Sequence, residues 1–152
     1  MTVFADSSAL VKIYIPEAGH QAISENREPV VISQLARVEV PAAFWRKHRT
    51  GELAASDAAI LAEDFEHDYQ GDPAGPPRFS VLPISEERLR VAALAVARHG
   101  LRAYDAVQLA SALAVRDGAN QADLRFATFD RQLRSAALVE GFTLLPEIAQ
   151  VV

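Results

Sequence analysis

Residues 1–14 read MTVFADSSALVKIY, and this stretch decides how the chain begins to fold. An apolar run, Val3-Phe4-Ala5, ends at Asp6, and a second apolar stretch follows the hydroxyls of Ser7 and Ser8. The pattern predicts a buried strand that passes directly into a helix. A carboxylate at such a junction is a helix cap, the partner of a fixed cation, or a ligand.

The same alternation continues along the chain. Short apolar runs predict strands at 2–5, 29–32, 79–83, 124–128 and 142–145. Segments of helical periodicity lie between them, at 8–15, 17–26, 33–49, 56–69, 86–99, 104–116 and 131–138. Strands that alternate with helices favour a parallel sheet covered on both faces. The sequence therefore predicts one α/β domain over residues 1–152, with a parallel sheet flanked by helices on both faces.

Composition narrows the class of protein. Cysteine is absent, so the fold has no disulfides, and no apolar run reaches the ~20 residues that span a bilayer. We expect a cytoplasmic protein with no membrane segment. The formal net charge of −5 argues against a nucleic-acid binder, which usually has a basic surface. Acidic residues gathered around a metal would be neutralised there, however, so the charge does not exclude such a partner.

Acidic side chains follow two of the predicted strands. Asp6 comes directly after the first strand, and Thr128 and Asp130 come after the fourth. In an open parallel sheet, ligand chemistry gathers at the carboxyl ends of strands. We therefore expect these side chains to meet at one edge of the sheet, although each aspartate is also an ordinary N-cap.

Two further acids have unusual surroundings. Glu39 lies on an apolar stripe of its predicted helix, where an unpaired carboxylate costs several kcal/mol. It could instead pair with Arg46 on the same face or with Arg102. Asp105 begins a helix that is apolar nearly all round, and the helix dipole stabilises it by only ~0.3–1 kcal/mol.

Taken together, the four carboxylates indicate a site. Gathered at one sheet edge they would repel one another and have raised pKa values. A divalent cation removes that repulsion, since hard cations prefer oxygen ligands. No histidine or cysteine accompanies any of these motifs, which argues against a side-chain nucleophile or a histidine acid–base pair.

The ordered motifs resemble those of the PIN-domain family, and more narrowly of VapC-type toxins from toxin–antitoxin pairs. They are Asp6-Ser7-Ser8-Ala9, Arg37-Val38-Glu39-Val40, Tyr104-Asp105-Ala106 and Thr128-Phe129-Asp130. The resemblance implies a five-stranded parallel sheet and an endoribonuclease dependent on Mg²⁺ or Mn²⁺. It also implies that Asp6, Glu39, Asp105 and Asp130 are the catalytic and metal-binding acids, supported by the hydroxyls of Ser8 and Thr128.

Some assignments stay open at this point. Asp123 is a rival for the fourth acid, and we prefer Asp130 because it follows a strand and lies two residues after Thr128. No carboxylate follows shortly after Asp130, which leaves one or two metals possible. For contact with RNA, the candidates are Arg102 beside Asp105, and Arg131 and Arg134 after Asp130.

The resemblance also implies partners and leaves alternatives. A VapC-type toxin would bind RNA as its substrate, a VapB-like antitoxin that inserts a cation into the acidic pocket, and a second copy of itself. A PIN-domain nuclease of RNA processing, outside a toxin system, has the same motifs. An inactive PIN-like binding module is the other alternative, and it would not bind the metal.

Overall fold

The structure is a computed structural model, and it describes residues 1–118 and 123–148. Every strand and helix predicted from the sequence is present, within a few residues of its predicted bounds. The elements run in the order β1 (Val3–Ala5), α1 (Ser7–Tyr14), α2 (His20–Ser24), β2 (Val30–Ser33), α3 (Ala36–Arg49), α4 (Ala55–Gln70), β3 (Ser80–Leu82), α5 (Glu86–His99), α6 (Ala103–Gly118), β4 (Arg125–Ala127), α7 (Arg131–Val139) and β5 (Thr143–Leu145). The largest difference is α2, which is shorter than predicted because Glu17 and its neighbours form a loop.

The five strands form one parallel sheet in the order β3-β2-β1-β4-β5, which confirms the predicted fold class. From β1 the chain moves outward to β2 and β3, then returns to the other side of β1 for β4 and β5. The winding therefore reverses between β1 and β4. At such a switch point the loops after the two strands diverge and leave a crevice at their carboxyl ends. Any ligand site of this fold is expected there.

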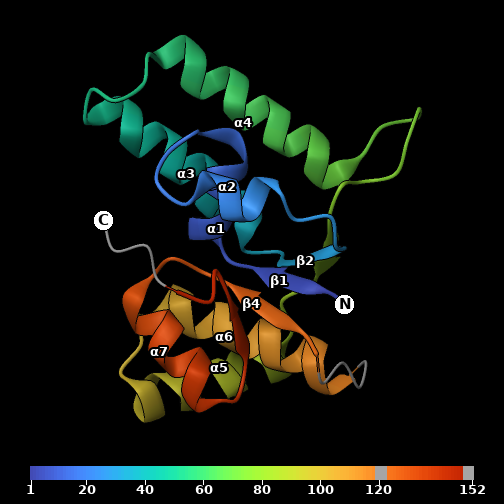
Figure 1. The fold of residues 1–152 in the computed structure, drawn as a ribbon, viewed down its shortest axis with the longest axis vertical. Helices are drawn as coiled ribbons and strands as arrows, with labels where there is room; N and C mark the ends of the chain where they lie inside the picture. The colour runs from blue at the N-terminus through green and yellow to red at the C-terminus, as the bar shows by residue number, and fades with distance from the viewer. Residues whose placement is uncertain (119–122, 149–152) are drawn as a thin grey trace.

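Two hydrophobic cores cover the two faces of the sheet. Helices α1 to α4 lie on one side of the sheet and α5 to α7 on the other (Figure 1). The alternation of side chains along β1 explains the division, because Phe4 points to one face and Val3 and Ala5 to the other. Phe4 stacks on Phe126 of β4 with ring centroids 5.3 Å apart. This contact fixes the spacing of the two strands that flank the switch point.

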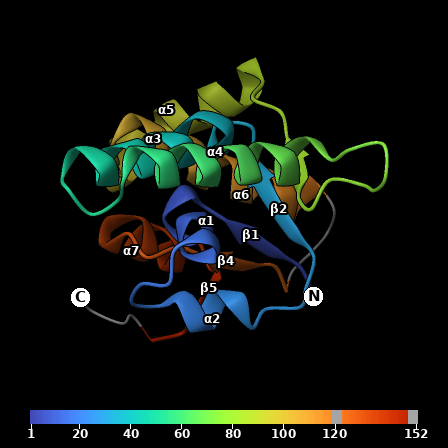
Figure 2. The same ribbon diagram turned by 90° about the horizontal axis from the view of Figure 1, so that it is seen from above.

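Helices α3 and α4 form an antiparallel pair on the outer side of α1 (Figures 1 and 2). The buried faces of this pair include Phe44 of α3 and Phe65 of α4, and Tyr14 of α1 packs edge-on against both rings. The packing holds the first turns of α3 beside α1. Over residues 1–118 and 123–148, no helix is both long and apolar enough to cross a membrane.

Candidate functional site

Asp6 lies at the switch point, between the end of β1 and the start of α1. Asp6 lies beside the end of β4. Ala5 pairs in register with Ala127, and the Asp6 amide donates to the Ala127 carbonyl at 3.1 Å. The Asp6 side chain is 3% exposed. Its Oδ1 accepts from the Ala9 amide at 3.0 Å, so the predicted helix cap exists.

Two hydroxyls also converge on the Asp6 carboxylate. Ser8 Oγ donates to Oδ1 at 2.7 Å, and Thr128 Oγ1 donates to Oδ2 at 2.6 Å from the far strand β4. Burial nevertheless dominates, and it raises the pKa of Asp6 to about 6 even though these donors lower it. The charge of Glu39 raises the Asp6 pKa further. Burying the charge of Asp6 destabilises the fold, and a helix cap does not require that burial, because an exposed aspartate caps a helix equally well.

Glu39 reaches the same place from the first turn of α3. Its Oε1 accepts from Ser7 Oγ at 3.0 Å and from Gln108 Nε2 of α6 at 2.7 Å. Within the part of the chain that the structure describes, no cation pairs with Glu39, so the predicted alternatives of Arg46 or Arg102 as its partner are wrong. Burial is the main cause that raises the pKa of Glu39, and the charge of Asp105 adds to it.

Asp105 and Asp130 form the other half of the cluster. Asp105 lies in the first turn of α6, and Asp130 caps α7 by accepting from the Leu133 amide at 2.8 Å. The Arg102 guanidinium contacts both: its Nε is 3.2 Å from Asp105 Oδ2, and its Nη2 is 3.5 Å from Asp130 Oδ2. Burial raises the pKa of Asp105, the Asp130 charge raises it further, and Arg102 acts in the opposite direction.

The four predicted acids are therefore neighbours in a row. Asp6 is affected by the charge of Glu39, Glu39 by that of Asp105, and Asp105 by that of Asp130. These residues come from four elements spread over more than 120 residues of sequence. Asp123, the rival for the fourth position, is exposed and precedes β4, so it lies at the opposite end of that strand from Thr128 and Asp130.

The donor set suits a hard divalent cation. Its ligands would be carboxylate oxygens, which Mg²⁺ and Mn²⁺ prefer, and among the described residues no cation pairs with Asp6 or Glu39. In residues 1–118 and 123–148, however, no three acidic or histidine side chains are already arranged as a metal cage. The residues thus fit the ion by their chemistry, and side-chain rotation would have to complete the coordination.

The loop from Thr128 to Asp130 is held from several directions. Ser8 Oγ accepts from the Phe129 amide at 2.9 Å, and the Thr128 carbonyl accepts from Arg134 Nη1 at 2.9 Å. The Phe129 ring packs under Lys12 Nζ, 4.6 Å from its centroid. It also packs against Gly19, where φ is +89° and any added Cβ would overlap the ring. The backbone at Thr128 and Phe129, which leads into Asp130, is therefore held by the surrounding core.

The three arginines predicted to contact RNA have different surroundings. Arg134 is 8% exposed and donates to the carbonyls of Thr128 and Pro146, so its guanidinium is engaged by the protein, and RNA contact stays a prediction for it. Its neighbours Leu133, Ala136 and Ala137 are buried as well. Arg131 is exposed at the start of α7. The exposed side chain of Arg102 is engaged by the two acids.

Two polar residues of the cluster were not predicted from the sequence. Ser7 and Gln108 both contact Glu39, and Gln108 is 1% exposed. Gln108 follows Asp105 by three residues, so both side chains lie on one face of α6. A glutamine in a helix that is otherwise apolar nearly all round was the available signal.

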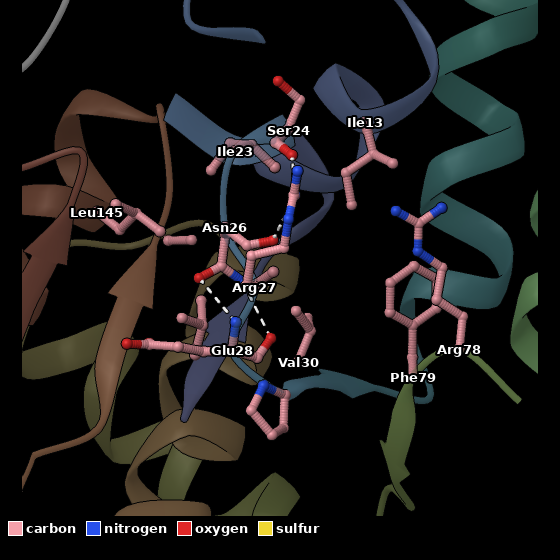
Figure 3. Close-up of a pocket in the computed structure, with 14 residues that line it drawn as sticks. Ile13, Ile23, Ser24, Asn26, Arg27, Glu28, Val30, Arg78, Phe79 and Leu145 are labelled. Atoms are coloured by element: carbon pink, nitrogen blue, oxygen red, sulfur yellow. Dashed lines mark hydrogen bonds between the residues drawn. The ribbon is translucent and has the colours of Figure 1, made fainter. Parts of the chain in front are cut away.

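One cavity among the described residues lies away from the acids. It has a volume of about 430 Å³ and lies against the α1–α2 side of the sheet, and its lining includes Ile13, Ile23, Arg27, Val30 and Leu145 (Figure 3). Its lining also includes Ala5 and Ala127, each one residue before a polar residue of the cluster. Its lining includes none of the four acids, so the acidic cluster is the candidate site on chemical grounds.

Comparisons with known proteins agree with this geometry. The family model for the PIN domain matches residues 3–139. Two curated relatives from Mycobacterium tuberculosis are Ribonuclease VapC45 of strain CDC 1551 and Ribonuclease VapC49 of strain H37Rv. Each is 33% identical over 147 residues, which cover 95% of this chain and 94% of the relative. The chain belongs to the PIN domain family, and its curated relatives are of the VapC type.

Solved structures show the same fold at lower identity. The crystal structure of PAE2754 from Pyrobaculum aerophilum aligns with a TM-score of 0.60 and 23% identity, over 90% of this chain and 79% of that one. The crystal structure of FitAcB from Neisseria gonorrhoeae aligns with a TM-score of 0.61 and 19% identity, over 94% of this chain and 96% of that one. The resemblance indicated by the sequence motifs is confirmed.

Proposed function

We propose that this protein is a metal-dependent endoribonuclease of the cytoplasm, the toxin of a VapBC-type toxin–antitoxin system, and that it hydrolyses RNA phosphodiester bonds. The observation that carries the proposal is the row of four acids at the switch point, where buried Asp6 and partly buried Glu39 have neutral donors alone within the described residues. Relatives named Ribonuclease VapC support RNA as the substrate class.

In this proposal Asp6 and Asp105 hold one Mg²⁺ or Mn²⁺, with Glu39 and Asp130 as direct ligands or ligands through water. The bound ion supplies positive charge against the phosphate and activates water for attack. In the overall hydrolysis one P–O bond breaks, the hydroxyl of a water molecule joins phosphorus, and the proton of that water ends on the leaving oxygen. Ser8 and Thr128 donate to opposite oxygens of Asp6 and thereby fix its rotamer.

The RNA backbone requires local positive charge on an acidic protein. Arg102 and Arg131 supply it at the edge of the cluster, next to Asp105 and Asp130. Because Arg102 is already paired with these acids, a metal that takes over the carboxylates would release its guanidinium toward a phosphate. Arg131, at the start of α7, is available without such a release.

Two partners follow from membership of the VapC type. The first is a VapB-like antitoxin, which would place a cation among the four acids. The exposed apolar side chains of Val38, Trp45 and Ile60 on α3 and α4 support a partner that covers this part of the surface. The second is another copy of the chain, for which exposed Leu94 and Val96 of α5 are candidates. Light scattering on the purified protein measures the second association directly.

The alternatives make different predictions. A PIN-domain nuclease of RNA processing would lack a small antitoxin gene immediately upstream of its own. An inactive PIN-like module would bind no Mg²⁺ or Mn²⁺ in a calorimetric titration. The complete set of acids favours an active enzyme over that module, because the charge of buried Asp6 destabilises a metal-free fold without any gain.

The test is cleavage of total RNA by the purified protein with Mn²⁺ or with a chelator, with the cut ends mapped. We expect discrete cuts with Mn²⁺ only, and a loss of at least about 100-fold in rate for Asp6→Asn and for Asp105→Asn, the change that removing a catalytic charge typically causes. Asp123→Asn is the matched control, since Asp123 is an exposed acid at the other end of β4. Cleavage at the wild-type rate by both site variants would overturn the proposal.

A further inference from the structure

Gln108 is a fully buried polar side chain in the middle of α6. It is 1% exposed, and the residues on either side of it, Val107 and Leu109, are buried apolar residues of the core. Burying an amide among such neighbours destabilises a fold unless its donors and acceptor are satisfied. The contacts of Gln108 therefore show what the amide is for.

The amide donors of Gln108 are directed at Glu39. Gln108 Nε2 donates to Glu39 Oε1 at 2.7 Å and to Ser7 Oγ at 3.3 Å, and Ser7 Oγ donates to the same Glu39 oxygen at 3.0 Å. The three side chains come from α6, α3 and α1, and they form a closed triangle around one carboxylate oxygen. In the described part of the chain, no hydrogen bond reaches the other oxygen, Glu39 Oε2.

The acceptor of Gln108 is not satisfied by the protein. Its Oε1 is buried without a hydrogen-bond partner among the described residues, a state that costs ~1–3 kcal/mol. An apolar side chain of similar length would avoid that cost. Stability alone thus does not explain a glutamine here, whereas its contact with Glu39 does.

Because Gln108 is a neutral donor, Glu39 keeps its negative charge and can still bind a metal. A cation beside this carboxylate would neutralise it and block a metal, while an amide stabilises the charge and leaves it in place. Donation to Oε1 alone fixes the plane of the carboxylate and leaves Oε2 as its free ligand atom. Asp105, whose charge acts on Glu39, lies one turn before Gln108 on the same helix.

We propose that Gln108 is a positioning residue for Glu39. Together with Ser7 it holds Glu39 Oε1, so that Glu39 Oε2 is available as a metal ligand beside Asp105. The inference rests on the proposed metal-dependent activity and assigns to this chain a support for Glu39 separate from the hydroxyls that support Asp6. Gln108 itself contacts neither metal nor RNA in this assignment, and its effect passes through Glu39.

The test compares Mn²⁺ affinity in calorimetric titrations of the wild type and Gln108→Met, which keeps the length of the side chain and removes its donors. Loss of a hydrogen bond to a metal-binding carboxylate typically weakens binding by 10–100-fold, and we expect a loss of about 10-fold. In the background of Glu39→Gln, we expect Gln108→Met to cause no further loss. The melting temperature in chelator should change little, because the lost bond to Glu39 offsets the removal of the unsatisfied Gln108 Oε1.

Two more variants make the outcome decisive. Ser111→Ala is the matched control, because Ser111 is equally buried on α6 but donates only to the Val107 carbonyl. It should leave Mn²⁺ affinity unchanged. Ser7→Ala removes the second donor from a partly exposed position, so it provides the same test if Gln108→Met does not fold. We expect it to weaken Mn²⁺ binding by a few-fold.

The outcomes distinguish a failure of the positioning role of Gln108 from a failure of the proposed metal-dependent activity. Wild-type Mn²⁺ affinity in folded Gln108→Met, or an equal loss in the Glu39→Gln background, overturns the positioning role. If Mn²⁺ binds the wild type and not Asp6→Asn, the proposed function stands whatever Gln108 does. If the wild type itself binds no Mn²⁺, the proposed function fails first.

Discussion

The two halves of the acidic cluster use the same side-chain chemistry in opposite settings. Asp6 and Glu39 are surrounded by neutral donors, namely hydroxyls, an amide and a backbone N–H. Asp105 and Asp130 face the same crevice but share an exposed cation, Arg102. One half is therefore fixed by the core, and the other is adjusted by a side chain that reaches in from solvent.

The difference shows that burial decides how a carboxylate can be held. Neutral donors orient a buried acid without cancelling its charge, so Asp6 keeps a raised pKa despite three of them. A cation at the surface cancels charge but binds weakly, because water and salt compete with it. Asp6 and Glu39 can bind a metal without losing a cation, whereas Asp105 and Asp130 must first exchange Arg102 for the metal.

The largest expected effect concerns Asp6. Its pKa of about 6 in the folded protein exceeds the ordinary 3.8, and the difference corresponds to about 3 kcal/mol. Because the folded state binds the proton more tightly, the free energy of unfolding is highest at low pH and falls as pH rises from about 4 through 6. In chelator at pH 7.5, Asp6→Asn should be more stable than the wild type by up to this amount.

Urea unfolding at pH 4 and pH 7.5 measures this effect. The advantage of Asp6→Asn should be large at pH 7.5 and nearly absent at pH 4, where Asp6 is protonated. Raised pKa values of Glu39 and Asp105 leave part of the pH dependence in the variant. Parallel pH profiles for the two proteins would contradict the burial argument.

The next largest expected change in stability concerns Arg134, which holds the loop from Thr128 to Asp130 between the two halves of the cluster. Arg134 donates to the Thr128 carbonyl at 2.9 Å and to the Pro146 carbonyl at 2.8 Å. Hydrogen bonds from a charged donor contribute ~1.5–3 kcal/mol, so Arg134→Met should lower the free energy of unfolding by about 2 kcal/mol. Arg131→Met, three residues earlier and exposed, should change it by less than about 0.5 kcal/mol. Equal stability of the two variants would show that the buried contacts do not form.

The fold could be predicted from the sequence because its signals are local. Apolar runs such as Val3-Phe4-Ala5 and the helical spacing that follows Asp6 need no distant contact to be recognised. Parallel pairing and the switch point then follow from the alternation of strands and helices. The four acids were predictable for the same reason, since three of them stand at element boundaries and the fourth interrupts an apolar stripe.

The resemblance implied the hydroxyls of Ser8 and Thr128 as supports, and both donate to Asp6, but the sequence could not show which groups support Glu39. Gln108 and Glu39 are 69 residues apart, and only the packing of α6 beside α3 brings them together. Arg102 and Arg134 are both arginines next to a motif acid, yet one is exposed and ion-paired and the other is buried against backbone carbonyls. Their roles depend on the path of the chain around them, which has no local signature.

The third prediction reverses the sign of the first. Asp130 is a partly exposed acid that caps α7 through the Leu133 amide at 2.8 Å, so its charge stabilises the fold. Asp130→Ala should lower the free energy of unfolding in chelator by about 1 kcal/mol, the usual cost of a lost N-cap. Asp130→Asn keeps the cap and should cost less. A gain in stability for Asp130→Ala, as expected for Asp6→Asn, would remove the distinction between the halves.

The smallest effect concerns Arg102, whose side chain is 77% exposed. Exposed ion pairs contribute ~0.2–1 kcal/mol, so Arg102→Gln should hardly change the stability of the metal-free protein at pH 7.5. It should nevertheless strengthen Mn²⁺ binding by about 2–3-fold at low salt, since the ion no longer displaces a bound cation from Asp105 and Asp130. The gain should disappear in high salt, where screening has already weakened the pair. If Mn²⁺ affinity falls in Arg102→Gln, or rises equally at all salt concentrations, Arg102 is not a competing counter-ion and the two halves bind the metal alike.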